Sequence, residues 1–289
     1  SSPPSSRVDR MEHFFVETNG VRLHCVGEGK GKLVLLLHGF PEFWYSWRHQ
    51  LPVLGKYFRA VAPDLRGYNE SDRPEGEENY RLEILVEDVA GLVEKLGGGR
   101  GMVVGHDWGG VIAWAFASLH PDLTEKLVIM NAPHPSVMAR RISSPEQSKK
   151  SWYIFFFRKE KEPEKFLEAE NYAVLKEVLR STAIKPAFKE EDLEKFVEAW
   201  SKPGALRAGI NYYRANGPES QARKLPKVKV PTLVIWGKED AFLSLEVSRA
   251  DEYVEAPYKV VYLENCGHWV QNEEPELVNR LLLEFLAGA

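Results

Sequence analysis

Short strand-like runs that alternate with helix-like segments constrain the fold of this 289-residue sequence more than any other feature. The runs are bounded by turn residues, and the segments between them space their apolar residues as amphipathic helices do. This alternation is typical of an α/β fold with a mainly parallel central sheet flanked by helices. The predicted strands are residues 32–37, 58–62, 101–104, 126–130, 232–236 and 258–263, and the predicted helices are residues 81–96, 110–119, 245–253 and 276–286.

Two regions depart from the alternation. Residues 14–18 and 22–26 alternate apolar and polar side chains around Asn19-Gly20, which predicts an antiparallel hairpin. Residues 135–222 have no good strand pattern and are rich in Glu, Lys, Phe and Ala at helical spacing, which predicts a helical cap inserted into the sheet domain. We therefore expect a disordered tail over 1–10 and an α/β core made of 11–134 and 223–289.

Composition and charge exclude several classes of function. A net charge of −4 gives no basic field, so nucleic acid is not an expected partner. The apolar runs are too short for a membrane span, and residues 1–10 lack the apolar core of a signal peptide. Cys25 and Cys266 have no neighbours at disulfide or metal spacing, which predicts no metal site and a cytoplasmic location.

Three reactive side chains follow predicted strands. Asp107, Asp240 and His268 occur in the order nucleophile, acid and histidine, and the carboxyl ends of parallel strands meet at one edge of a sheet. Each also has a simpler interpretation: Asp107 as a helix N-cap, Asp240 as a turn residue with Glu239 as the acid, and His268 as a packed surface histidine. Glycines on both sides of Asp107 are typical of a strained strand-to-helix turn. The joint pattern therefore favours a catalytic triad.

An aspartate nucleophile indicates a particular chemistry. With a reference pKa of about 4, Asp107 is ionised at pH 7 and can attack an sp³ carbon to form an alkyl ester. Epoxides and alkyl halides offer such a carbon, whereas attack on an ordinary ester would give an unstable anhydride. His268, oriented by Asp240, would then activate water for attack on the ester carbonyl.

Three motifs carry a resemblance to a known family. They are HGFPE at 38–42, DLRGYNESDRP at 64–74 and GHDWGG at 105–110. From about residue 12 to residue 287 the chain resembles the α/β-hydrolase fold, and within it the soluble-type epoxide hydrolases. The resemblance implies a cis Phe40–Pro41 bond and no cofactor. The oxyanion that forms on the Asp107 carboxyl would be held by the backbone N–H groups of Phe40 and Trp108.

The same resemblance implies a pair of cap tyrosines that assist ring opening, one in each half of the cap. The matching residues are Tyr153 in KSWYIFFF and Tyr213 in NYYRAN. A neutral tyrosine hydroxyl, with a reference pKa near 10, suits proton donation to an alkoxide. Adjacent helical residues point about 100° apart, so only one of Tyr212 and Tyr213 can face the sheet well. An alternative is that these tyrosines belong to an aromatic core.

Two other functions stay open. A haloalkane-type dehalogenase would use the same aspartyl ester, with Trp152 as a halide donor, although Phe40 stands where one class of dehalogenases has Asn. A non-catalytic receptor for a small hydrophobic molecule would not require the triad and both tyrosines.

The expected partner is a small hydrophobic epoxide bound by a monomer or homodimer. Bulky aromatic residues near the motifs suggest an apolar pocket for aryl or alkyl epoxides. The predicted pocket walls are Trp44, Phe155, Phe156 and Phe157.

Overall fold

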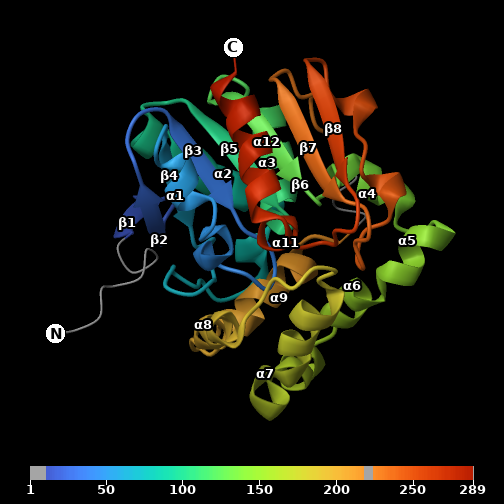
Figure 1. The fold of residues 1–289 in the computed structure, drawn as a ribbon. Coiled ribbons are helices and arrows are strands. Elements are labelled where there is room, and N and C mark those ends of the chain that lie inside the picture. Colours follow the sequence, from blue (N-terminus) through green and yellow to red (C-terminus); the bar gives the residue numbers. More distant parts are fainter. Residues whose placement is uncertain (1–10, 218–223, 289) are drawn as a thin grey trace.

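A computed structural model describes residues 11–217 and 224–288 and confirms the predicted α/β fold (Figure 1). The described residues form one eight-stranded sheet in the order β1-β2-β4-β3-β5-β6-β7-β8. β1 and β2 form the predicted hairpin, β2 pairs antiparallel with β4, and all other neighbours are parallel. The strands are β1 (Glu12–Thr18), β2 (Val21–Glu28), β3 (Leu33–Leu37), β4 (Arg59–Pro63), β5 (Gly101–His106), β6 (Thr124–Met130), β7 (Thr232–Gly237) and β8 (Tyr258–Leu263).

Helices cover both faces of the sheet. α2 and α3 pack against each other on one face, and α1 and α12 contact each other on the other face (Figure 1). These helices and the short α11 are α1 (Leu51–Leu54), α2 (Leu82–Gly97), α3 (Trp108–Leu119), α11 (Val270–Glu273) and α12 (Pro275–Ala287). The parallel strands are therefore enclosed, which explains why β3 and β5 read as continuous apolar runs.

A run of helices lies between β6 and β7 in the chain. In Figure 1 the later helices of this run lie below the edge where the parallel strands end. α7 is interrupted at 169–172, where three consecutive residues have positive φ. The tail predicted over 1–10 and the predicted end of the cap at 222 lie outside the described residues. The helices are α4 (Pro135–Arg141), α5 (Pro145–Lys150), α6 (Trp152–Phe157), α7 (Glu162–Thr182), α8 (Glu190–Trp200) and α9 (Ala205–Ala215).

The prediction of a helix over residues 245–253 is wrong. The chain there forms two single 3₁₀ turns, Leu245–Val247 and Asp251–Tyr253. The Ser248 hydroxyl donates to the Leu245 carbonyl (2.6 Å), and the Ala250 N–H donates to a tyrosine hydroxyl of β8 (2.9 Å). Side chains thus take backbone partners that an α-helix would need, and they end the helix before it elongates.

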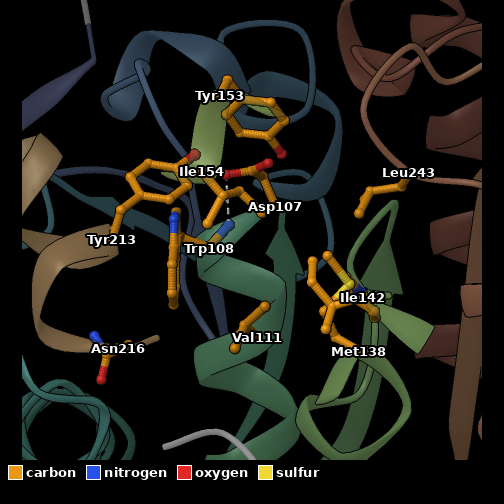
Figure 2. A pocket seen from close by; sticks show the side chains of 11 residues that line it. Asp107, Trp108, Val111, Met138, Ile142, Tyr153, Ile154, Tyr213, Asn216 and Leu243 are labelled. Atoms are coloured by element: carbon orange, nitrogen blue, oxygen red, sulfur yellow. Dashed lines mark hydrogen bonds between the residues drawn. The ribbon is translucent and has the colours of Figure 1, made fainter. Parts of the chain in front are cut away.

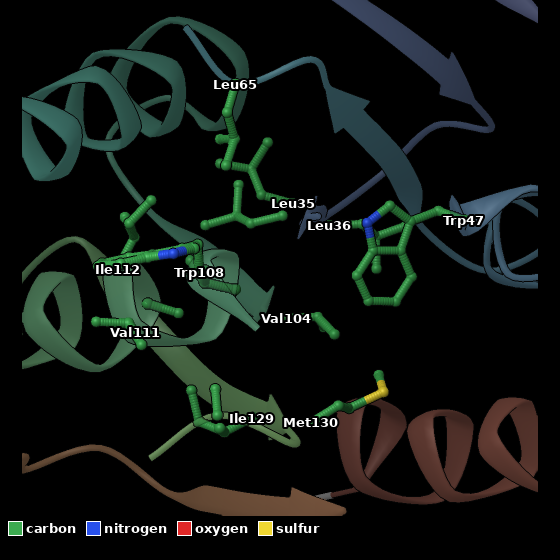
Figure 3. Close-up of a cluster of buried hydrophobic side chains, with 14 of the residues drawn as sticks. Leu35, Leu36, Trp47, Leu65, Val104, Trp108, Val111, Ile112, Ile129 and Met130 are labelled. Carbon is green, nitrogen blue, oxygen red and sulfur yellow. The ribbon is translucent and has the colours of Figure 1, made fainter. Parts of the chain in front are cut away.

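The apolar core lies directly beneath the ends of β3 and β5. Leu35, Leu36 and Val104 from these two strands are fully buried, as is Ile129 of β6. Leu35 lies on the side of the sheet that holds Ile112 of α3, whereas Leu36 and its register partner Val104 lie on the opposite side, where Leu36 is beside Trp47 (Figure 3). Interiors of this kind are close-packed and resist displacement. The turns that follow β3 and β5 are therefore attached to strands whose side chains are fully buried.

Candidate active site

The turn between β5 and α3 holds Asp107 in an unusual backbone conformation. Its φ is 56° and its ψ is −127°, a region that residues other than glycine rarely adopt. The neighbouring glycines allow this turn because the chain passes very close to itself. A Cβ atom added to Gly109 would lie 2.2 Å from the carbonyl oxygen of Leu37, and one added to Gly105 would lie 2.3 Å from the oxygen of Gly109. The strain therefore points the Asp107 carboxylate out of the sheet edge.

The two oxygens of Asp107 have different surroundings. Oδ2 accepts hydrogen bonds from the backbone N–H groups of Trp108 (2.7 Å) and Phe40 (3.0 Å). Oδ1 lies 2.9 Å from Nε2 of His268. The Phe40–Pro41 peptide bond is cis. The structure thus places two amides from separate loops on one oxygen of the nucleophile candidate, as an oxyanion hole requires.

Asp240 orients the His268 ring. Oδ2 of Asp240 lies 2.6 Å from Nδ1 of His268, and both side chains are buried. The other oxygen, Oδ1, accepts hydrogen bonds from the backbone N–H groups of Phe242 and Leu243. The neighbouring Glu239 is exposed, so the acid beside the histidine is Asp240.

Charge within this trio sets the protonation of the free site. Burial opposes the charged form of His268, but Asp240 and Asp107 outweigh it and raise the pKa of His268 well above its ordinary value. Burial likewise opposes ionisation of Asp107, but His268 lowers the pKa of this carboxyl below its ordinary value. The resting site therefore contains an aspartate anion facing an imidazolium.

Tyr153 and Tyr213 lie across the cavity from the sheet edge. In Figure 2 both hydroxyls point toward the Asp107 carboxylate, Tyr153 from α6 and Tyr213 from α9. Burial and the nearby Asp107 charge raise the pKa of each hydroxyl well above its ordinary value, so both are protonated donors. Tyr212 points away, and its hydroxyl donates to the buried carbonyl of Arg66 (2.7 Å). The tyrosine that faces the site is therefore Tyr213.

Two cavities of unequal volume meet at Asp107. The smaller has a volume of about 50 Å³ and is drawn in Figure 2; its walls include Val111, Met138, Ile142 and Leu243. The larger has a volume of about 300 Å³ and extends toward α6 and α7, where its walls are mostly apolar. Both cavities reach Asp107, Tyr153 and Tyr213.

Of the predicted pocket walls, Phe156 and Phe157 line the larger cavity, whereas the predictions for Trp44 and Phe155 are wrong. The Trp44 ring packs against His13 of β1, with 5.4 Å between ring centroids. Phe155 lies on the outer face of α6 and is 55% exposed. A six-residue helix can present only part of its surface to a cavity, and the aromatic run FFF therefore divides between inside and outside.

Two buried residues beside the site have contacts that motif reasoning missed. Nδ1 of His106 lies 2.8 Å from Oε1 of Glu42, and Nε2 lies 2.7 Å from the carbonyl oxygen of His268. The His106 ring therefore bridges a carboxylate oxygen of Glu42 and the backbone of the residue predicted as the catalytic histidine. Glu42 also accepts a hydrogen bond from the N–H of Gly39 (3.1 Å). Together with His106 it thereby connects the loop that carries the Phe40 amide with the turn that carries the Trp108 amide and with the loop that carries His268. The signal was present, because both residues stand inside the quoted motifs HGFPE and GHDWGG.

Asn131, the residue after β6, was also given no role. Its side-chain N–H donates to Oδ2 of Asp240 (2.9 Å), and its side-chain oxygen accepts the N–H of Gly237 (2.8 Å). Asn131 has a φ of 40°, which asparagine tolerates better than most residues. This side chain fixes the acid against the end of β7.

Neither a metal cluster nor a membrane-spanning helix is present in the described residues. Within 11–217 and 224–288, no cluster of three or more His, Cys, Asp or Glu side chains is arranged to hold a metal ion. None of the helices formed by these residues is long and apolar enough to cross a membrane.

Known proteins resemble this chain over nearly its whole length. Residues 32–275 match the family model for the alpha/beta hydrolase fold. Epoxide hydrolase 4 of Mus musculus is 41% identical over 94% of this chain and 78% of its own, and AB hydrolase superfamily protein YfhM of Bacillus subtilis is 41% identical over 96% of this chain and 99% of its own. Among solved structures, a Bacillus megaterium epoxide hydrolase bound to an inhibitor superimposes with a TM-score of 0.88 at 33% identity, covering 95% of this chain and all of that one.

Proposed function

Because this chain belongs to the epoxide hydrolase family of the α/β-hydrolase fold, we propose that it adds water to an epoxide and releases a vicinal diol. One observation carries the proposal. A single carboxylate, Asp107, has one oxygen held by two backbone amides and faces two tyrosine hydroxyls across the cavity (Figure 2). Ring opening needs a nucleophile on one side of the epoxide and an acid on the other.

In the first step, Oδ1 of Asp107 attacks an epoxide carbon and forms a C–O bond while the ring C–O bond breaks. The electron pair of the broken bond moves to the epoxide oxygen, where charge develops. The hydroxyls of Tyr153 and Tyr213 hydrogen-bond this oxygen, and one of them gives it a proton. O–H donors suit a basic alkoxide better than a halide, which supports an epoxide over an alkyl halide.

In the second step, water attacks the ester carbonyl of Asp107. Ester formation has removed the negative charge that helped to raise the pKa of His268, so this pKa falls. The imidazolium proton then passes through water to the tyrosinate that ring opening left, and the neutral ring can accept a proton from the attacking water. The oxyanion on Oδ2 is stabilised by the N–H groups of Phe40 and Trp108. The bond between the ester carbonyl carbon and Oδ1 then breaks, and His268 gives its proton to Oδ1, which leaves with the diol. The new Asp107 carboxylic acid finally gives its proton to His268, which restores the carboxylate and the imidazolium of the resting site.

The unequal cavities support an unsymmetrical substrate. A volume of about 50 Å³ accepts a hydrogen or a short substituent, whereas about 300 Å³ accepts a bulky aryl or alkyl group. A variant of the Bacillus megaterium relative has been solved with its product (R)-3-[1]naphthyloxy-propane-1,2-diol, which carries one bulky aromatic arm. We infer an apolar epoxide with one large and one small end. The cytoplasmic location, supported by the free Cys25 and Cys266, and the monomeric or dimeric state stay predictions.

One single-turnover experiment tests the covalent mechanism. Limiting epoxide is mixed with excess enzyme in ¹⁸O-labelled water, and the diol and the peptide containing Asp107 are analysed by mass spectrometry. We expect the first diol to be unlabelled, because its new oxygen comes from Oδ1, and the label to enter the Asp107 carboxyl. Label in the first diol would refute the ester. Halide release from haloalkanes with inert epoxides would favour the dehalogenase, and binding with no turnover of either would favour the receptor.

A further inference from the structure

Four aromatic side chains form a surface patch on α6 and the start of α7. We name this patch the aromatic rim and define it by its members, which are Trp152, Phe155, Phe156 and Phe166. Trp152, Phe155 and Phe166 are 65%, 55% and 47% exposed. The Phe156 ring joins the patch together, with ring centroids 6.5 Å from Trp152 and 5.6 Å from Phe166. Exposed aromatic groups of this kind are rare on a surface that has no partner.

The aromatic rim is continuous with the larger cavity. Trp152, Phe156 and Phe166 line that cavity, which leads to Asp107 and His268. Phe155 belongs to the same helix but does not line the cavity, so substrate binding gives no reason for its exposure. The surface beside the opening of the larger cavity is therefore more apolar than substrate binding requires.

Basic residues flank the α6 part of the aromatic rim in the sequence, and two of them, Lys149 and Lys150, line the larger cavity together with Trp152. Residues 149–161 contain five basic side chains and one acidic side chain, Glu160, although the whole chain has a net charge of −4. Beyond this segment, Oε2 of Glu162 lies 4.0 Å from Nζ of Lys159, and Oε1 of Glu164 lies 2.6 Å from Nη2 of Arg214 in α9. The basic residues are Lys149, Lys150, Arg158, Lys159 and Lys161. Residues 149–161, which carry the α6 part of the rim, thus have a charge opposite to that of the whole chain, whereas residues 162–170 around Phe166 contain four acidic residues and one basic residue.

We propose that the aromatic rim docks on an anionic lipid surface and thereby places the mouth of the larger cavity against it. Tryptophan and phenylalanine beside lysine and arginine are typical of segments that lie in a membrane interface. Anionic lipids attract such basic clusters, and apolar epoxides partition into the same layer. A second copy of this chain is the competing occupant, and a measurement of dimer formation distinguishes it from lipid.

Vesicle binding tests the proposal without depending on turnover. The wild-type chain is cosedimented with vesicles of phosphatidylcholine and with vesicles that also contain phosphatidylglycerol, at low and high salt. We expect binding to the anionic vesicles only, and weaker binding at high salt because salt screens the attraction. The double variant Phe155→Ser/Lys159→Glu should bind about tenfold or more weakly, since each basic residue near such a surface contributes about fivefold.

A matched control replaces one exposed basic and one exposed aromatic residue outside the insertion. Lys56 and Tyr57 follow α1 and are both exposed. Lys56→Glu/Tyr57→Ser should bind vesicles as the wild type does, and both double variants should turn over a small water-soluble epoxide at the wild-type rate. Equal binding to neutral and anionic vesicles, no binding, or equal losses in both variants would overturn the proposal. Concentration-dependent dimers that disappear in Phe155→Ser/Lys159→Glu would also overturn it, in favour of a second copy.

Discussion

Two adjacent tyrosines on α9 allow the same chemical change to be made once outside and once inside the site. Tyr213→Phe removes a hydroxyl that points toward Asp107, whereas Tyr212→Phe removes a hydroxyl that donates to the buried carbonyl of Arg66 (2.7 Å). Loss of one donor to a developing oxyanion typically slows a reaction by 10²–10³-fold. Because Tyr153 remains as a second donor, we expect Tyr213→Phe to slow ring opening by about 10²-fold, or about 2.7 kcal/mol.

The opposite result is expected for the neighbour. Tyr212→Phe leaves a buried carbonyl without this donor, which costs about 1–2 kcal/mol of unfolding free energy and lowers Tm by roughly 2–5 °C. Its ring-opening rate should stay within about twofold of wild type, whereas Tyr213→Phe should change the unfolding free energy by less than about 0.5 kcal/mol. Stopped-flow fluorescence, with Trp108 beside Asp107 as the reporter, measures ring opening, and thermal unfolding measures stability. Loss of activity in Tyr212→Phe with normal rates in Tyr213→Phe would refute the assignment.

Three further predictions concern the triad and its turn. His268→Gln should stop ester hydrolysis, so the peptide containing Asp107 should gain the mass of the epoxide; an unmodified peptide after incubation would contradict the covalent step. Asp107→Asn removes an anion that raises the pKa of His268, so NMR titration should give a lower pKa for His268 than in the wild type, and an equal or higher value would contradict the charge argument. Gly109→Ala places a Cβ atom 2.2 Å from the Leu37 carbonyl oxygen and should destabilise the fold by more than about 3 kcal/mol in urea unfolding. Gly98→Ala is the control, because its Cβ would meet nothing within 4 Å. We expect it to lower the free energy of unfolding by only about 1 kcal/mol, because the position has a positive φ. Equal losses of unfolding free energy in the two variants would show that crowding is not the cause.

The proximity of Asp107, Asp240 and His268 could be predicted from the sequence because it depends on topology. Asp107, Asp240 and His268 each follow a strand of one parallel sheet, and the carboxyl ends of such strands meet at the same edge. The roles of these residues in the reaction remain a proposal. Glu42 and His106 were quoted only as parts of motifs, because their contact spans 64 residues and joins two loops that no local pattern relates.

The aromatic residues show where sequence reasoning is weakest. Residues 155–157 are all phenylalanine, yet Phe157 is buried, Phe156 is partly buried, and Phe155 is exposed. Side-chain type predicts that such a run favours burial, but the face of the helix that meets the cavity depends on how α6 packs against α9. Trp44 was misplaced for the same reason, since its neighbour His13 comes from β1, 31 positions earlier in the chain.

By itself the sequence determined the fold class, the nucleophile candidate and the kind of bond that it can attack. These follow from local properties, which are the alternation of strands and helices, the glycines around Asp107, and the charge of a carboxylate at pH 7. Only the tertiary structure decided that Tyr213 faces the site, that two cavities of unequal volume meet at Asp107, and that Phe155 lies at the surface. These features depend on the packing of the inserted helices over the sheet. That packing is set by side chains far apart in the chain, so it is not encoded in any one stretch of sequence.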